Sequence, residues 1–125
     1  MSKALVIIPT YNEKENISSI IDAVLSLKDN IEILIVDDGS PDGTAEIVKS
    51  IQSKQSRIHL LQRSGKLGLG TAYITGFKWG LAQGYEYLIE MDADFSHPPA
   101  KILELLHACE SLGADIAIGS RYITG

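Results

Sequence analysis

The chain has 125 residues, of which 45% are hydrophobic and 22% charged, as expected for one globular domain with its own core. Its formal net charge of −5 excludes a broad nucleic-acid-binding surface, so an anionic ligand would need a local cation or a metal ion. No apolar run approaches the roughly 18 residues that cross a bilayer, and the first residues do not resemble a signal peptide. Together with the single cysteine, Cys109, this predicts a cytoplasmic protein.

Two hydrophobic periodicities alternate along the chain. Short continuous apolar runs predict strands buried on both faces, and apolar residues three and four positions apart predict helices. The predicted strands are 4–9, 31–36, 58–61, 85–91 and 115–119. The predicted helices are a stripe over 17–25, a helix capped by Thr44, a helix over about 70–82, and a helix that opens at Pro98 or Pro99 with a stripe of Ile102, Leu105, Leu106, Cys109 and Leu112.

This alternation of strands and helices predicts an α/β fold. Right-handed crossovers would give a mostly parallel sheet with helices on both faces. A parallel sheet normally covers each strand with the helix that follows it, and here no helix follows the last predicted strand. We therefore expect residues 1–125 to form a single, partial domain that is truncated on its C-terminal side.

Polar clusters stand directly after the predicted strands. They cover residues 10–13, 37–40 and 92–94, and a fourth candidate covers residues 120–122. In open α/β sheets, ligands bind outside the carboxyl ends of the strands. If the predicted topology holds, these clusters share one edge of the sheet and form a site.

The Asp92-Ala93-Asp94 triplet is the strongest candidate for a metal site. Two carboxylates this close repel each other unless a cation lies between them. Oxygen ligands favour hard divalent ions such as Mg²⁺ or Mn²⁺, which keep coordination positions for substrate phosphates and water. The alternative is a pair of solvated loop carboxylates, one of which caps the next helix.

The polar clusters 10–13 and 37–40 also have both a structural and a functional interpretation. Asp37 and Asp38 precede strong turn signals that require positive φ at Gly39 and Gly43, and either carboxylate is also a suitable acceptor for a ribose hydroxyl or a base N–H. Glu13 suits the first turn of a helix, and Tyr11 is either a surface ring or a platform for a base. The glycine-rich run 66–70 fits neither a P-loop nor a dinucleotide fingerprint. Gly76 and Gly80, with Ala72, form a row of small residues that predicts close packing of a helix on the sheet.

The clusters together resemble the inverting glycosyltransferases of family 2, which have the GT-A fold, a Rossmann-like α/β fold. The matching runs are 6–13, 36–40 and 92–94. Within that family the chain is most similar to dolichyl- or polyprenyl-phosphate mannosyltransferases, through runs 40–44, 68–70, 91–99 and 119–122. The resemblance covers essentially the whole chain, and the combination of runs is far more specific than any one of them.

The resemblance implies a GDP-mannose donor, an isoprenoid monophosphate acceptor at the cytoplasmic face of a membrane, and a divalent metal, Mg²⁺ or Mn²⁺. The residues that it implies for the nucleoside pocket are Pro9, Tyr11, Glu13, Val36 and Asp38. Those that it implies for the diphosphate and the metal are Asp92, Ala93 and Asp94, with Arg121 on phosphate. Ser96 stands where relatives often have a glutamine ligand, and its hydroxyl is shorter. The family's chains continue well beyond residue 125, so we expect this chain to bind the nucleotide sugar without completing turnover.

The mechanism implied is a single displacement at the anomeric carbon, with Asp92, Asp94 and Arg121 acting on the leaving diphosphate. Three alternatives remain open at this point. One is a family 2 transferase that uses a UDP-sugar, and another is a receiver-like domain with acidic residues at its strand ends. The third is a module that binds the nucleotide sugar without catalysis.

Overall fold

The computed structural model describes residues 4–27, 29–64, 69–93, 102–104, 107 and 116–119. The elements along the chain are β1 (Ala4–Thr10), α1 (Ile17–Leu25), β2 (Ile31–Asp37), α2 (Thr44–Gln52), β3 (Ile58–Gln62), α3 (Leu69–Gln83), β4 (Tyr87–Met91) and β5 (Ile116–Gly119). None of the helices in these ranges has the length and apolar character needed to span a bilayer.

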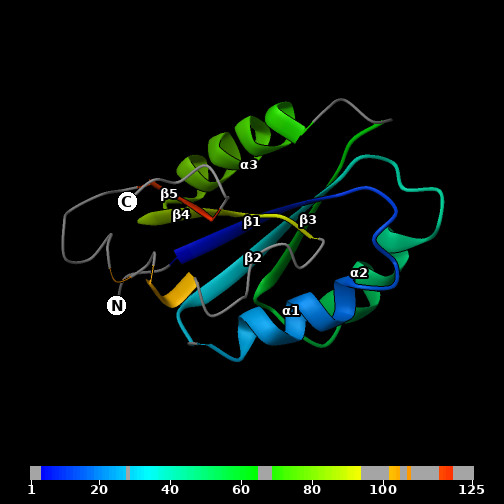
Figure 1. The fold of residues 1–125 in the computed structure, drawn as a ribbon, viewed down its shortest axis with the longest axis horizontal. Helices are drawn as coiled ribbons and strands as arrows, with labels where there is room; N and C mark the ends of the chain where they lie inside the picture. Colours follow the sequence, from blue (N-terminus) through cyan, green and yellow to red (C-terminus); the bar gives the residue numbers. More distant parts are fainter. Residues whose placement is uncertain are drawn as a thin grey trace.

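The five strands form one sheet in the order β3-β2-β1-β4-β5, and every neighbouring pair is parallel. This confirms the predicted parallel α/β fold. The chain builds outward from β1 to β2 and β3, then crosses to the other side of β1 for β4 and β5 (Figure 1). The strand order therefore reverses between β1 and β4, which is the position where open α/β sheets bind their ligands.

Helices cover both faces of the sheet. Helices α1 and α2 lie on one face and α3 lies on the other (Figure 1). Alternate residues of β1 point to opposite faces, so Val6 and Ile8 pack with α1 while Leu5 and Ile7 pack under α3. All four side chains are fully buried. At about 1.5–3 kcal/mol for each large aliphatic side chain, this two-sided burial is the main force that holds the layers together.

The predicted row of small residues is confirmed as the contact between α3 and the sheet. A Cβ on Gly76 would lie 2.5 Å from Cγ2 of Ile7, and a Cβ on Gly80 would lie 2.6 Å from Cδ2 of Leu88. Ala72, one turn earlier, is fully buried. Helix α3 therefore approaches β1 and β4 more closely than any larger side chain at these two glycines would permit.

The end of α3 explains why the fourth strand begins two residues later than predicted. Gly84 has a φ of 85°, and its N–H donates to the carbonyl of Leu81, while the N–H of Tyr85 donates to the carbonyl of Gly80. These two bonds form a Schellman motif, which Tyr85 completes by stacking on Trp79 with ring centroids 6.0 Å apart. Since the N–H of Tyr85 caps the helix, the strand starts only at Tyr87.

The other predicted elements differ by small amounts. Strands β1, β2 and β3 each continue one residue further than predicted, and β5 begins at Ile116. Residues 102–104 and 107 are helical, as predicted for the segment after Pro99, and Ile102 joins the core shared with α1. The rest of that predicted stripe, including Cys109, lies outside the described residues.

Candidate functional site

The carboxyl ends of the strands bring the predicted clusters to one edge of the sheet. Thr10 pairs with Asp37, and Asp37 pairs with Gln62, so the last residues of β1, β2 and β3 are level. On the other side of β1, Ile7 pairs with Glu90. Continuing this register by two residues brings Asp92 level with Pro9. Asp38 and Asp92 therefore follow strands that end at the same edge, as predicted.

Asp37 holds the turn after β2 together. Its carboxylate is fully buried and accepts hydrogen bonds from the hydroxyls of Thr10 and Ser40, at 2.6 Å each, and from the N–H of Ser40 at 3.0 Å. The predicted turn geometry is confirmed, because Gly39 has a φ of 68° and Gly43 a φ of 92°. Of the two neighbouring aspartates, Asp37 thus has the structural role.

The loop after β1 is fastened to the loop after β2 by three successive backbone N–H groups. The N–H of Asn12 donates to Oγ of Ser40 at 2.9 Å, that of Glu13 to Oγ1 of Thr44 at 3.1 Å, and that of Lys14 to Oδ2 of Asp42 at 3.1 Å. Asn12 has a left-handed φ of 57°, which turns the chain into this arrangement. The two loops therefore form one unit beside the strand ends.

The prediction that Thr44 caps α2 is wrong. The cap residue is Gly43, which has no side chain, and Thr44 is the first helical residue. Asp42 takes the capping role, because its Oδ1 accepts from the N–H of Thr44 at 3.0 Å and from the Thr44 hydroxyl at 2.5 Å. The Thr44 hydroxyl, and then the N–H groups of Lys14 and Thr44, lower the pKa of Asp42. The hydroxyl of Thr44 is instead the acceptor that holds the loop after β1.

Asp38 forms a two-bond ion pair with Arg63, a residue that sequence reasoning missed. Nε and Nη2 of Arg63 donate to the two carboxylate oxygens of Asp38 at 2.6 and 2.8 Å, and the side chains are only 11% and 8% exposed. Nη1 of Arg63 also reaches the hydroxyls of Thr71 at 3.1 Å and Thr75 at 3.4 Å, on α3. The signal available in the sequence was position, since Arg63 stands two residues after the end of the predicted strand 58–61 and directly follows β3 as the structure has it.

Asp92 accepts a hydrogen bond from a side chain of α3. The hydroxyl of Tyr73 donates to Oδ1 of Asp92 at 2.6 Å, and Tyr73 is only 8% exposed. Two residues before Asp92, burial and then the charge of Asp92 raise the pKa of Glu90. Two acidic side chains therefore lie close enough to influence each other at the end of β4, and a bound cation relieves repulsion of this kind.

The remaining predicted nucleoside residues lie in different environments. Pro9 is buried in β1, and Val36 is fully buried in the apolar cluster under α3. Glu13 is partly buried beside Thr44, and Tyr11 is 38% exposed. Ala93 is 5% exposed and belongs to the core on the other face. Asp94, Ser96 and Arg121 lie outside the described residues.

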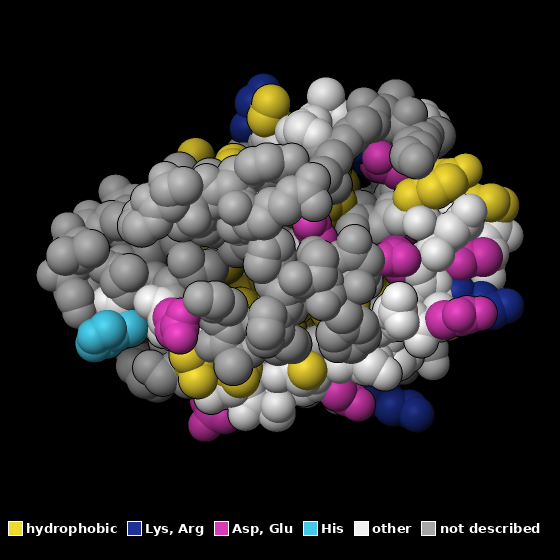
Figure 2. Space-filling model, in the orientation of Figure 1, with side chains coloured by type: hydrophobic (Ala, Val, Ile, Leu, Met, Phe, Trp, Pro, Cys, Tyr) yellow, Lys and Arg dark blue, Asp and Glu magenta, His cyan; other side chains and the backbone are white. Residues whose placement is uncertain are grey.

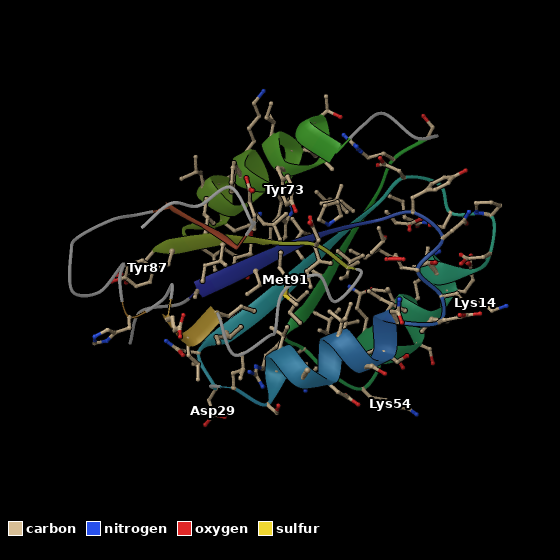
Figure 3. The ribbon with its side chains drawn as sticks, viewed as in Figure 1. Lys14, Asp29, Lys54, Tyr73, Tyr87 and Met91 are labelled. Atoms are coloured by element: carbon tan, nitrogen blue, oxygen red, sulfur yellow. The ribbon has the colours of Figure 1, made fainter. Side chains whose placement is uncertain are left out.

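The loop after β1 lies at one end of the molecule and the start of β4 lies at the other, as the positions of Lys14 and Tyr87 show (Figure 3). Asp and Glu side chains are present at the end where the loops after β1 and β2 lie, with Lys and Arg side chains beside them (Figure 2).

Within the described part of the chain, no three His, Cys, Asp or Glu side chains are grouped as a metal site. The carboxylate of Asp92 is nevertheless a hard oxygen ligand of the kind that Mg²⁺ and Mn²⁺ prefer.

The structure is an open, parallel α/β sheet with carboxylates directly after its strands, close to the point where the strand order reverses. The chain belongs to the family Glycosyl transferase family 2, which matches residues 5–125. This confirms the family indicated by the sequence.

Curated relatives match almost the whole chain. It is 50% identical over 124 residues to polyprenol monophosphomannose synthase of Mycolicibacterium smegmatis, covering 98% of this chain and 46% of the relative. It is 44% identical over 123 residues to undecaprenyl-phosphate mannosyltransferase of Micrococcus luteus, covering 98% of this chain and 50% of the relative. The chain thus spans about half the length of these relatives.

A solved structure has the same fold. The mannosyltransferase from Pyrobaculum calidifontis in complex with GDP-Man and Mn²⁺ superimposes with a TM-score of 0.63 and 28% sequence identity. The match covers 74% of this chain and 27% of that one. This likeness confirms the predicted GT-A fold.

Proposed function

We propose that this chain is the nucleotide-sugar-binding part of an inverting mannosyltransferase, which transfers mannose from GDP-mannose to a dolichyl or polyprenyl phosphate. The observation that carries the proposal is the placement of Asp38 and Asp92 after strands that end at one edge of the sheet. One side chain of α3 donates a hydrogen bond to Asp92, and another accepts a hydrogen bond from the arginine that pairs with Asp38. The names of the relatives support mannose and an isoprenoid phosphate as the two substrates.

The nucleoside would bind on the β1–β2 side of this edge, against Tyr11, Glu13 and Asp38, which follow the strands that contain the buried Pro9 and Val36. Tyr11 supplies an exposed ring suited to stacking. Asp38 supplies carboxylate lone pairs in an orientation fixed by Arg63, and a carboxylate oxygen has more than one acceptor position. These groups suit the ring faces and N–H donors of a purine base.

The diphosphate would bind on the β4 side, with Asp92 and Asp94 holding a divalent metal and with Ala93, Ser96 and Arg121 nearby. The bound metal would supply positive charge to the leaving diphosphate, and this neutralisation carries most of the catalytic effect. Arg121 would donate to a phosphate oxygen from the end of the fifth strand. Asp92 and Asp94 hold the carboxylate charge that brings the cation to this position.

The reaction is a single displacement. An oxygen of the acceptor phosphate forms a bond to the anomeric carbon of mannose, the bond from that carbon to the GDP oxygen breaks, and the configuration inverts. A phosphate monoester is already largely ionised near neutral pH, so the chain needs no carboxylate as general base. Because the acceptor is a lipid, we propose that the protein works at the cytoplasmic face of a membrane.

Calorimetry of GDP-mannose binding, with and without Mn²⁺, tests this function without requiring turnover. We expect binding that depends on Mn²⁺ and exceeds that of UDP-glucose. Asp92→Ala and Asp94→Ala should each abolish the Mn²⁺-dependent part, whereas Asp22→Ala, at an exposed position on α1, should leave it unchanged. Binding that ignores Mn²⁺ and survives Asp94→Ala would refute the assignment, and a preference for UDP-glucose would refute the choice of nucleotide.

A further inference from the structure

Tyr73 stands out as a buried polar group whose partner is a residue of the proposed metal site. Its ring belongs to the apolar cluster between α3 and the sheet, and its hydroxyl donates to Oδ1 of Asp92 at 2.6 Å. Figure 3 labels Tyr73 on the side of the sheet that α3 covers. A bond of this length from a hydroxyl to a carboxylate is in the range of strong, charge-assisted hydrogen bonds.

The hydrogen bond restricts how Asp92 presents its carboxylate. With Oδ1 held by the phenol, rotation of the Asp92 side chain would break a short hydrogen bond to a tyrosine that is only 8% exposed, which carries a free-energy cost. A single orientation of a carboxylate is what a metal site requires of its ligands. The tyrosine ring is too constrained by its apolar neighbours to follow a moving aspartate.

Helix α3 is fixed firmly enough to serve as the reference for this orientation. Gly76, one turn after Tyr73, lies against Ile7 at a distance that leaves no room for a Cβ. The residues two positions before and after Tyr73 are Thr71 and Thr75, and both accept hydrogen bonds from Arg63. The backbone that carries Tyr73 is therefore tied to β1 and to the end of β3.

We propose that Tyr73 is a positioning residue that sets the geometry of Asp92 for the divalent metal, an inference that rests on the proposed function. Tyr73 touches neither the metal nor the nucleotide sugar. It acts through Asp92 by holding one carboxylate oxygen, so that the metal meets a ligand already oriented for it. Removal of such an outer partner typically weakens metal binding by about 10–100-fold.

The test compares Tyr73→Phe with Tyr85→Phe in the purified chain. Each change removes one hydroxyl that donates to a carboxylate at 2.6 Å, but Tyr85 binds Glu32, near the start of β2 at the opposite end of the sheet. Mn²⁺ affinity is measured in the presence of GDP by the paramagnetic resonance of free Mn²⁺. We expect a roughly tenfold or greater loss for Tyr73→Phe and none for Tyr85→Phe.

The outcomes separate this inference from the function on which it rests. Mn²⁺ binding to wild type with GDP, unchanged by Tyr73→Phe, overturns the positioning role and leaves the proposed function standing. Failure of wild type to bind Mn²⁺ with GDP overturns the proposed function, and this inference with it. An equal loss in both variants also overturns the positioning role, because it would report general destabilisation.

A measurement on wild type keeps the inference testable if Tyr73→Phe does not fold. In protein labelled with ¹³C at tyrosine Cζ, addition of Mg²⁺ and GDP should shift the resonance of Tyr73, because its acceptor becomes a metal ligand. The resonance of Tyr85 should not move. An unmoved Tyr73 resonance at saturating Mg²⁺ contradicts the proposal.

Discussion

The contact between α3 and β1 predicts a clear difference between two Gly→Ala substitutions in the same helix. Alanine at Gly76 would place its Cβ 2.5 Å from Cγ2 of Ile7 and 3.3 Å from two further atoms of that side chain. Ile7 is fully buried at the centre of the sheet, so it cannot move aside without disturbing its own neighbours. Alanine at Gly70 meets no other atom within 4 Å.

The effect of each substitution on the free energy of unfolding depends on two opposing contributions. Replacing glycine by alanine in a helix gains up to about 1 kcal/mol from backbone entropy at either position. Inserting a methyl group into a packed core costs about 1–3 kcal/mol. We therefore expect Gly70→Ala to be neutral or slightly stabilising, and Gly76→Ala to be less stable than Gly70→Ala by about 1–3 kcal/mol.

Urea unfolding, followed by far-ultraviolet circular dichroism, measures this difference. For a domain of this size, each kcal/mol also corresponds to a shift of about 3–6 °C in Tm, so thermal melts provide an independent check. If Gly76→Ala unfolds at the same urea concentration as Gly70→Ala, then α3 does not lie as close to β1 as described, and the reasoning from the small-residue row fails.

Three further predictions follow from the hydrogen bonds at the two ends of the sheet. Arg63→Ala leaves the mostly buried carboxylate of Asp38 without its ion-pair partner, and should cost about 3 kcal/mol in urea unfolding; a change below about 0.5 kcal/mol would contradict the pair's importance. Thr10→Val keeps the shape of the side chain but removes one hydroxyl from buried Asp37, and should cost about 1–3 kcal/mol; the same measurement with Thr10→Ser, which keeps the hydroxyl, should show a smaller loss. Burial, and next the hydrogen bond to Glu32, raise the pKa of Tyr85, so the folded state favours the neutral phenol. The resulting stability is fully present below the unfolded tyrosine pKa of about 10 and is lost as the pH rises above it. The urea midpoint of wild type should therefore fall more steeply above pH 10 than that of Tyr85→Phe, and parallel curves would refute this.

The fold could be predicted because its hydrophobic pattern is strong and local. Strands such as Ala4–Thr10 are apolar on both faces, and helices such as Ile17–Leu25 have one apolar stripe, so the alternation of the two specified a parallel sheet. The first residue of β4 was harder to predict from the sequence, because it depends on whether the N–H of Tyr85 closes a helix or joins a strand. That choice is made by the left-handed conformation of Gly84, which periodicity does not reveal.

The site was predicted at the level of the sheet edge, but its internal connections were not. Asp37 and Asp38 are neighbours with the same chemistry, yet one is buried in a turn and the other pairs with Arg63, 25 positions away. Tyr73 has the pattern of a core aromatic, and its ring is indeed in the core. Only the three-dimensional arrangement shows that its hydroxyl reaches Asp92.

The side chains that hold Asp38 and Asp92 in place come from about one turn of the same helix, α3. Thr71 and Thr75 bind the guanidinium that pairs with Asp38, and Tyr73, between them, binds Asp92. The orientation of both carboxylates thus depends on how α3 fits against the sheet, and a shift of the helix would disturb both together. In chimeras that exchange segments between this chain and a relative, α3 should therefore come from the same parent as both β2 and β4.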